Sequence, residues 1–83
     1  LGTNDLDLEQ LRYYPNPVES ELVISYIDPL ENVEIYDVTG KRVFKQKYES
    51  KSITIDFSRF SSGTYMVKVM TAEGSQFIKI IKK

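Results

Sequence analysis

The sequence contains no cysteine, histidine or tryptophan, and only one of its 83 residues is alanine. Without cysteine or histidine it has no disulfide scaffold, no zinc finger, no cysteine nucleophile and no imidazole base for a catalytic triad. Its four glycines are widely spaced, so a glycine-rich phosphate loop is absent as well. The cluster of Ser58, Ser61 and Ser62 has no base to activate it. These absences predict that the chain is not an enzyme and holds no cofactor or metal ion.

No stretch reaches the roughly 18–20 apolar residues that a membrane span requires, so no membrane span is predicted. The net charge of −1 provides no overall field to attract nucleic acid. The charge is nevertheless uneven, because residues 1–37 carry nine acids and one base whereas residues 38–83 carry three acids and ten bases. Either the basic half has a function, or acidic and basic strands pair across the fold, which we favour.

Residues that favour strands are abundant: valine and isoleucine number 15, and tyrosine and phenylalanine number 10. Apolar runs at 11–14, 21–26, 32–38, 42–48, 52–57, 64–71 and 75–81 predict strands. Turns are expected at 28–29, 39–40 and 72–74, and loops at 49–51 and 58–63. The pattern predicts an all-β, antiparallel two-sheet immunoglobulin-like β-sandwich of about seven strands. The mixed faces of 42–48 indicate an edge strand.

Residues 1–10 are polar and acidic, and we interpret them as a linker from a preceding cargo domain, with 11–83 as the folded domain. The sequence starts at Leu1 rather than at methionine, which predicts a piece of a longer protein. Acidic and amide side chains alternate in this segment (Asn4, Asp5, Asp7 and Glu9). They lack the glycine and the distal glutamate of an EF-hand loop, so a solvated acidic tail is favoured over a calcium site.

Six tyrosines raise the alternative of a carbohydrate- or protein-binding adhesion module. Strand alternation places Tyr26 and Tyr65 inward and leaves Tyr36 and Tyr48 as candidates for exposure. Exposed coplanar tyrosines would favour the adhesion module. A bare structural spacer between other domains is a third possibility, because a sandwich fold does not determine function.

Four motifs occur in order along the chain. They are Tyr14-Pro15-Asn16-Pro17, Asp37-Val38-Thr39-Gly40-Lys41, the segment 61–67 with Gly63, Tyr65 and Val67, and a Lys-x-x-x-Lys end from Lys79 to Lys83. Together they resemble the type A C-terminal sorting domain of the type IX (Por) secretion system of Bacteroidetes. The resemblance extends over 70 of the 83 residues, from Tyr14 to Lys83.

The resemblance implies a secretion signal. Such a domain follows a cargo that reaches the periplasm first, and it directs the cargo through the outer-membrane translocon. A sortase-like peptidase then usually removes the domain, and the cargo stays at the cell surface or is released. The implied partners are therefore the translocon, the peptidase and the N-terminal cargo. No nucleic acid or small-molecule ligand is expected.

Structural roles are expected for most motif residues. Pro15 and Pro17 fix φ, Gly40 permits a tight hairpin turn, and Gly63 permits a sharp bend before Tyr65. The terminal segment differs because apolar and basic residues interleave in it. Our hypothesis is that this segment carries the translocon-facing signal through an edge offered for strand pairing. Its members are Phe77, Ile78, Lys79, Ile80, Ile81, Lys82 and Lys83. The alternative, equally weighted, is that the segment only completes the sandwich.

Overall fold

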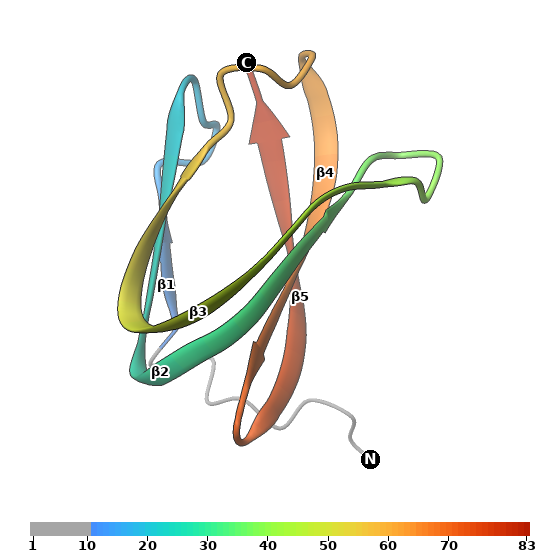
Figure 1. Ribbon diagram of the computed structural model, residues 1–83. Coiled ribbons are helices and arrows are strands. Elements are labelled where there is room, and N and C mark those ends of the chain that lie inside the picture. Colours follow the sequence, from blue (N-terminus) through green and yellow to red (C-terminus); the bar gives the residue numbers. More distant parts are fainter. Residues whose placement is uncertain (1–10) are drawn as a thin grey trace.

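The computed structural model describes residues 11–83, which form an all-β, antiparallel fold. Its strands are β1 (Arg12–Tyr14), β2 (Glu21–Tyr36), β3 (Arg42–Asp56), β4 (Gly63–Thr71) and β5 (Gly74–Lys82). Within this described part there is no helix, and hence none long and apolar enough to cross a membrane (Figure 1). The interpretation of residues 1–10 as a linker, and the weighing of a calcium site there, concern residues outside the described part.

The expected number of seven strands is wrong, because two pairs of predicted strands are continuous. Segments 21–26 and 32–38 join in β2, which ends at Tyr36, and segments 42–48 and 52–57 join in β3, which ends at Asp56. The turn expected at Asp28-Pro29 is a bend inside β2. There the pairing with β3 jumps from Ser25 to Leu30, so the missing N–H of Pro29 removes no ladder hydrogen bond. The loop expected at 49–51 is likewise strand.

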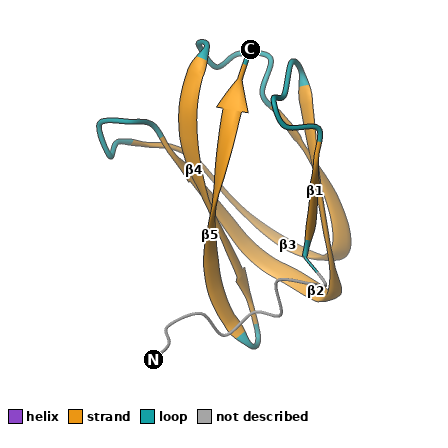
Figure 2. Cartoon of the chain, turned by 180° about the vertical axis from the view of Figure 1, so that it is seen from behind, coloured by secondary structure: helices purple, strands orange, loops and turns teal. Residues whose placement is uncertain are grey.

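The bends make one sheet fold over into two layers. The first half of β2 pairs with β1 and with the second half of β3. The second half of β2 pairs with the first half of β3 and with β4, and β4 pairs with β5. Figures 1 and 2 show the β2–β3 hairpin curving across both layers, with its tip projecting from the body. Because β3 pairs only with β2, the prediction of an edge strand at 42–48 is confirmed.

Alternate side chains from the two layers meet in one core. The fully buried ones include Leu22, Ile24, Val33, Ile35, Ile55, Phe57, Val67, Val69 and Ile80. The inward placement of Tyr26 and Tyr65 is confirmed, since they are 5% and 7% exposed. The ring of Phe57 meets the rings of Phe60 and Tyr65 edge to face, at centroid distances of 5.0 and 6.0 Å. The period-two alternation in the sequence therefore placed Tyr26 and Tyr65 on the correct face.

Candidate functional site

The terminal strand β5 divides the predicted recognition residues between two faces. Ile78 and Ile80 point into the core and are 5% and 0% exposed. Phe77 and Ile81 are 48% and 42% exposed, and Lys79 between them is exposed as well. The outer residues therefore add apolar surface that the core does not use. Within the segment 77–81, only these three side chains are accessible to a partner while the domain is folded.

The last two lysines lie at the end of β5. Lys82 is half-buried, and Lys83 is exposed. The Lys83 ammonium lies 3.8 Å from a carboxylate oxygen of Glu19, but both side chains are largely in solvent. A solvent-exposed ion pair of this kind contributes little to stability.

The Pro-Asn-Pro motif lies against the outer edge of β5. Nδ2 of Asn16 donates to the carbonyl of Lys79 at 3.2 Å, and Oδ1 of Asn16 accepts from the N–H of Ile81 at 3.0 Å. The side-chain amide thus replaces a neighbouring strand's peptide group. Both flanking bonds, Tyr14–Pro15 and Asn16–Pro17, are cis. Through the two hydrogen bonds of Asn16, the motif connects the start of the domain to its end.

Val18 continues this contact with backbone hydrogen bonds. Its N–H donates to the carbonyl of Ile81 at 2.8 Å, and its carbonyl accepts from the N–H of Lys83 at 2.9 Å. Val18 and Lys82 form an isolated parallel bridge, and Val18 itself is fully buried. Asn16 and Val18 therefore occupy the hydrogen-bonding edge of β5 over Lys79–Lys83 and close it to a further strand. The sequence had suggested an edge available for pairing there.

The β2–β3 turn is organised by Asp37. Its Oδ1 accepts hydrogen bonds from the N–H and the hydroxyl of Thr39, at 2.9 and 2.6 Å, and from the N–H of Lys41 at 3.1 Å. The Thr39 side chain contributes most to holding the pKa of Asp37 below its ordinary value. Gly40 has φ of +88°, which confirms the expected tight turn. These motif residues build the hairpin tip.

The third motif anchors β4 to the loop before it. The hydroxyl of Tyr65 donates to the carbonyl of Ser61 at 2.7 Å, and the Tyr65 ring stacks on Phe60 at 5.4 Å. A tyrosine hydroxyl bonded to backbone a few residues upstream is typical of immunoglobulin-like sandwiches. Gly63 has φ of +148°, and Val67 is fully buried. This motif therefore has a structural role as well.

Glu34, which the sequence analysis did not single out, lies on the outer surface of the layer that contains β5. Glu34 accepts a hydrogen bond from the hydroxyl of Tyr36, and Arg42 lies 3.7 Å from its carboxylate. The bond from Tyr36, together with the charges of Arg42, Lys45 and Lys68, lowers the pKa of Glu34. Cross-strand pairs of opposite charge, such as Glu34 with Lys45, bear out part of the expected strand pairing.

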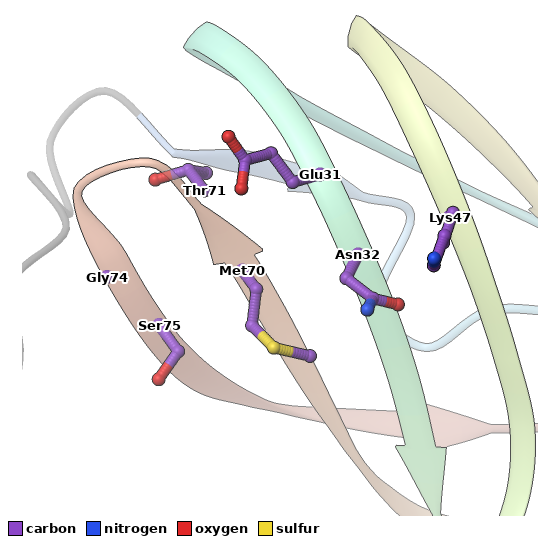
Figure 3. Close-up of a pocket in the computed structure, with 7 residues that line it drawn as sticks. All are labelled: Glu31, Asn32, Lys47, Met70, Thr71, Gly74 and Ser75. Carbon is purple, nitrogen blue, oxygen red and sulfur yellow. The ribbon is translucent and has the colours of Figure 1, made fainter.

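An open pocket of about 530 Å³ lies at the other end of the same surface, beside the β4–β5 turn (Figure 3). Its lining includes Asn32, Lys47, Met70 and Ser75, which come from four different strands. The side-chain oxygen of Asn32 is buried without a hydrogen-bond partner among the described residues. The lining has no aromatic ring on which a sugar would stack.

The tyrosines do not form a binding platform. Tyr36 and Tyr48, the candidates for exposure, are half-buried. Tyr13 and Tyr14 are the more exposed pair, at 37% and 54%, but consecutive strand residues point to opposite faces. The exposed tyrosines are therefore not coplanar, so the condition that would favour the adhesion module is not met, and the secretion signal remains the favoured assignment.

Comparison with known proteins supports this assignment. The family model described as "secretion system C-terminal sorting domain" matches residues 12–83. An ulvan lyase of Nonlabens ulvanivorans is 33% identical over 72 residues, which cover 83% of this chain and 13% of the lyase. This chain therefore corresponds to only a small part of that protein.

Two solved structures share the fold. PorZ, a surface component of the type IX secretion system of Porphyromonas gingivalis, superposes with a TM-score of 0.74 at 21% identity, covering 99% of this chain and 12% of PorZ. A DUF3244 family protein of Bacteroides vulgatus, an immunoglobulin-like β-sandwich, gives 0.75 at 17% identity, with coverage of 89% and 85%. The predicted fold class is thereby confirmed.

Proposed function

This chain belongs to the family of secretion system C-terminal sorting domains, and on that premise we propose that the type IX translocon recognises the outward side chains of β5. Residues 12–83 are a C-terminal sorting signal for type IX secretion. The observation that carries the proposal is the exposure of Phe77 and Ile81 on either side of Lys79 on the terminal strand. Exposed apolar groups that the core does not need are characteristic of interaction sites.

Recognition through side chains, rather than through strand pairing, follows from the closed edge. A partner strand would have to displace the hydrogen bonds that Asn16 and Val18 make to Lys79–Lys83. The side chains of Phe77, Lys79 and Ile81 require no such rearrangement. Ile78 and Ile80 act indirectly, because their burial holds β5 in place.

The proposal also covers the whole secretion route of the cargo. A cargo domain preceding this chain crosses to the periplasm, the sorting domain brings it to the outer-membrane translocon, and a sortase-like peptidase at the surface removes the domain. Residues 1–10 would then be the connection near the cut. The cargo remains at the surface or is released. The resemblance of the four motifs and the family match support this route.

Export of a fluorescent cargo tests the proposal. The cargo carries a general signal peptide at its front and residues 1–83 at its back, in a bacterium that has the type IX system. The double variant Phe77→Ser/Ile81→Ser should leave the cargo in the periplasm. The matched control is Ile27→Ser/Val38→Ser, which removes two apolar side chains that are 51% and 76% exposed elsewhere. The control should be exported normally.

Three results would count against the proposal. Retention of the unmodified fusion would contradict a sorting role for this chain. Normal export of the β5 variant would show that its outer side chains are not the recognised part. Retention of both variants would indicate a general effect of lost surface hydrophobicity. Thermal unfolding of each variant domain must show that it is still folded for the comparison to hold.

A further inference from the structure

The outer surface of the layer that contains β5 is strongly basic. Cross-strand neighbours form two rows on it, running from β3 through β2 and β4 to β5. The first row is Lys45, Glu34, Lys68 and Phe77. The second row is Arg42, Tyr36, Met66 and Lys79. These eight residues, here called the basic face, contain four cations and a single acid, which is Glu34.

The opposite outer surface has no such excess. On the layer of β1, the cross-strand rows are Arg12–Ser25–Ser52, Tyr14–Val23–Thr54 and Glu21–Asp56, with one cation and two acids. The difference between the surfaces is not visible in the net charge of −1. Folding therefore places four of the ten basic residues of the C-terminal half together on one side.

The cations of the basic face surround aromatic and apolar groups. The Lys68 ammonium lies 5.8 Å from the centre of the Phe77 ring, and the ring of Tyr36 lies 6.3 Å from it. Met66 remains 37% exposed beside them. Tyrosine, phenylalanine, methionine and arginine are enriched at protein interfaces, whereas lysines suit the rim.

Glu34 does not neutralise the basic face. Its carboxylate is already engaged by Tyr36 and Arg42, and its side chain is only 13% exposed. Lys45 and Lys79 are exposed at the two sides of the face, on the edge strands β3 and β5. Their charges are therefore directed toward solvent, where they attract a negatively charged partner.

We infer that the basic face docks an acidic protein surface, and that this contact extends recognition of β5 across all four strands of its layer. This inference rests on the proposed function and names the chemistry of the partner. An acidic protein fits better than a polyanionic glycan, because a glycan could stack on Phe77 but would not use the apolar side chain of Met66. Four strands spaced about 4.8 Å apart span roughly 15 Å, a width suited to a small, transient interface.

Charge removal in the export assay tests this inference. The variant Lys45→Gln/Lys68→Gln/Lys79→Gln should reduce the initial export rate about tenfold, since surface charges chiefly govern the rate of encounter. The matched control, Arg12→Gln/Lys51→Gln/Arg59→Gln, removes three exposed cations outside the basic face and should keep the original rate. The charge-preserving variant Lys45→Arg/Lys68→Arg/Lys79→Arg should also be exported.

A fourth variant, Met66→Ser, distinguishes the kind of partner. A reduced rate in this variant supports a protein surface. A normal rate beside a slow charge variant would show recognition of anionic groups alone, as on a glycan, and would overturn the inference.

Equal export rates of the charge variant and the unmodified fusion would overturn the inference, and so would slow export of the control variant. Retention of the unmodified fusion would instead contradict the proposed function. Thermal unfolding of the variant domains separates lost contact from lost folding.

Discussion

The backbone N–H of Ile81 donates a hydrogen bond of 3.0 Å to the side-chain oxygen of Asn16, across 65 residues of sequence. The side-chain nitrogen of Asn16 in turn donates a hydrogen bond of 3.2 Å to the carbonyl of Lys79. One side chain thus joins the first family motif to the last. The proline-rich motif is therefore more than a rigid bend, because it holds the terminal strand that we propose the translocon contacts.

Asn16→Ala should lower the free energy of unfolding by about 1–2 kcal/mol, because each hydrogen bond contributes about 0.5–1.5 kcal/mol. Urea denaturation measures the change, and the N–H of Ile81 should exchange faster with solvent. Gln76→Ala is the control, since its side-chain amide donates only to the neighbouring carbonyl of Phe77. Equal effects of the two variants would contradict the role assigned to Asn16.

Ile80→Ala and Ile81→Ala should separate folding from recognition. Removing the fully buried Ile80 side chain should cost about 2–5 kcal/mol of stability. Removing the Ile81 side chain, which is 42% exposed, should cost about 1 kcal/mol or less. Denaturant titration of both variants checks this. A similar loss in both would mean that Ile81 is also a packing residue.

Acid should weaken the β2–β3 turn. The pKa of Asp37 is lowered in the folded state, chiefly by the Thr39 side chain, so its contribution is present above the ordinary value of 3.8 and is lost as the pH falls through the folded pKa. Asp37→Asn should therefore be less stable than the original chain near neutral pH and should approach it in acid. Thermal unfolding as a function of pH tests this. A constant difference down to about pH 2 would contradict it.

Gly40→Ala should destabilise the hairpin by about 1–2 kcal/mol through backbone strain alone. At φ of +88° an added Cβ would meet no atom within 4 Å, so no steric clash contributes. Gly40→Asn should lose less, because asparagine adopts this conformation more readily. Chemical denaturation of the two variants gives the comparison. An alanine variant as stable as the original would exclude a required positive φ.

Tyr65→Phe should lower stability by about 0.5–1.5 kcal/mol, since the carbonyl of Ser61 loses its donor while the ring packing is kept. Tyr14→Phe is the control, because the Tyr14 side chain is 54% exposed. Its effect should stay within about 0.5 kcal/mol. Differential scanning calorimetry of both variants measures the changes. No shift for Tyr65→Phe would argue against an anchoring hydroxyl.

The sequence by itself determined the fold class and the inward faces. Alternation of apolar side chains reflects the local geometry of an extended backbone, so the inward placement of Tyr26 and Tyr65 could be predicted without knowledge of the strand pairing. The family could likewise be identified from short motifs, since each is a contiguous run of residues. Turn residues such as Gly40 were predictable for the same local reason.

Only the tertiary structure decided the strand count, the closed edge of β5 and the basic face. Asp28-Pro29 looks like a turn in the sequence, but an unpaired bend lets β2 continue through it. The contact between Asn16 and Ile81, and the gathering of Lys45, Lys68 and Lys79 on one surface, join residues from separate strands. Such arrangements depend on the path of the whole chain, because pairing between distant strands is set by global packing and not by local preference.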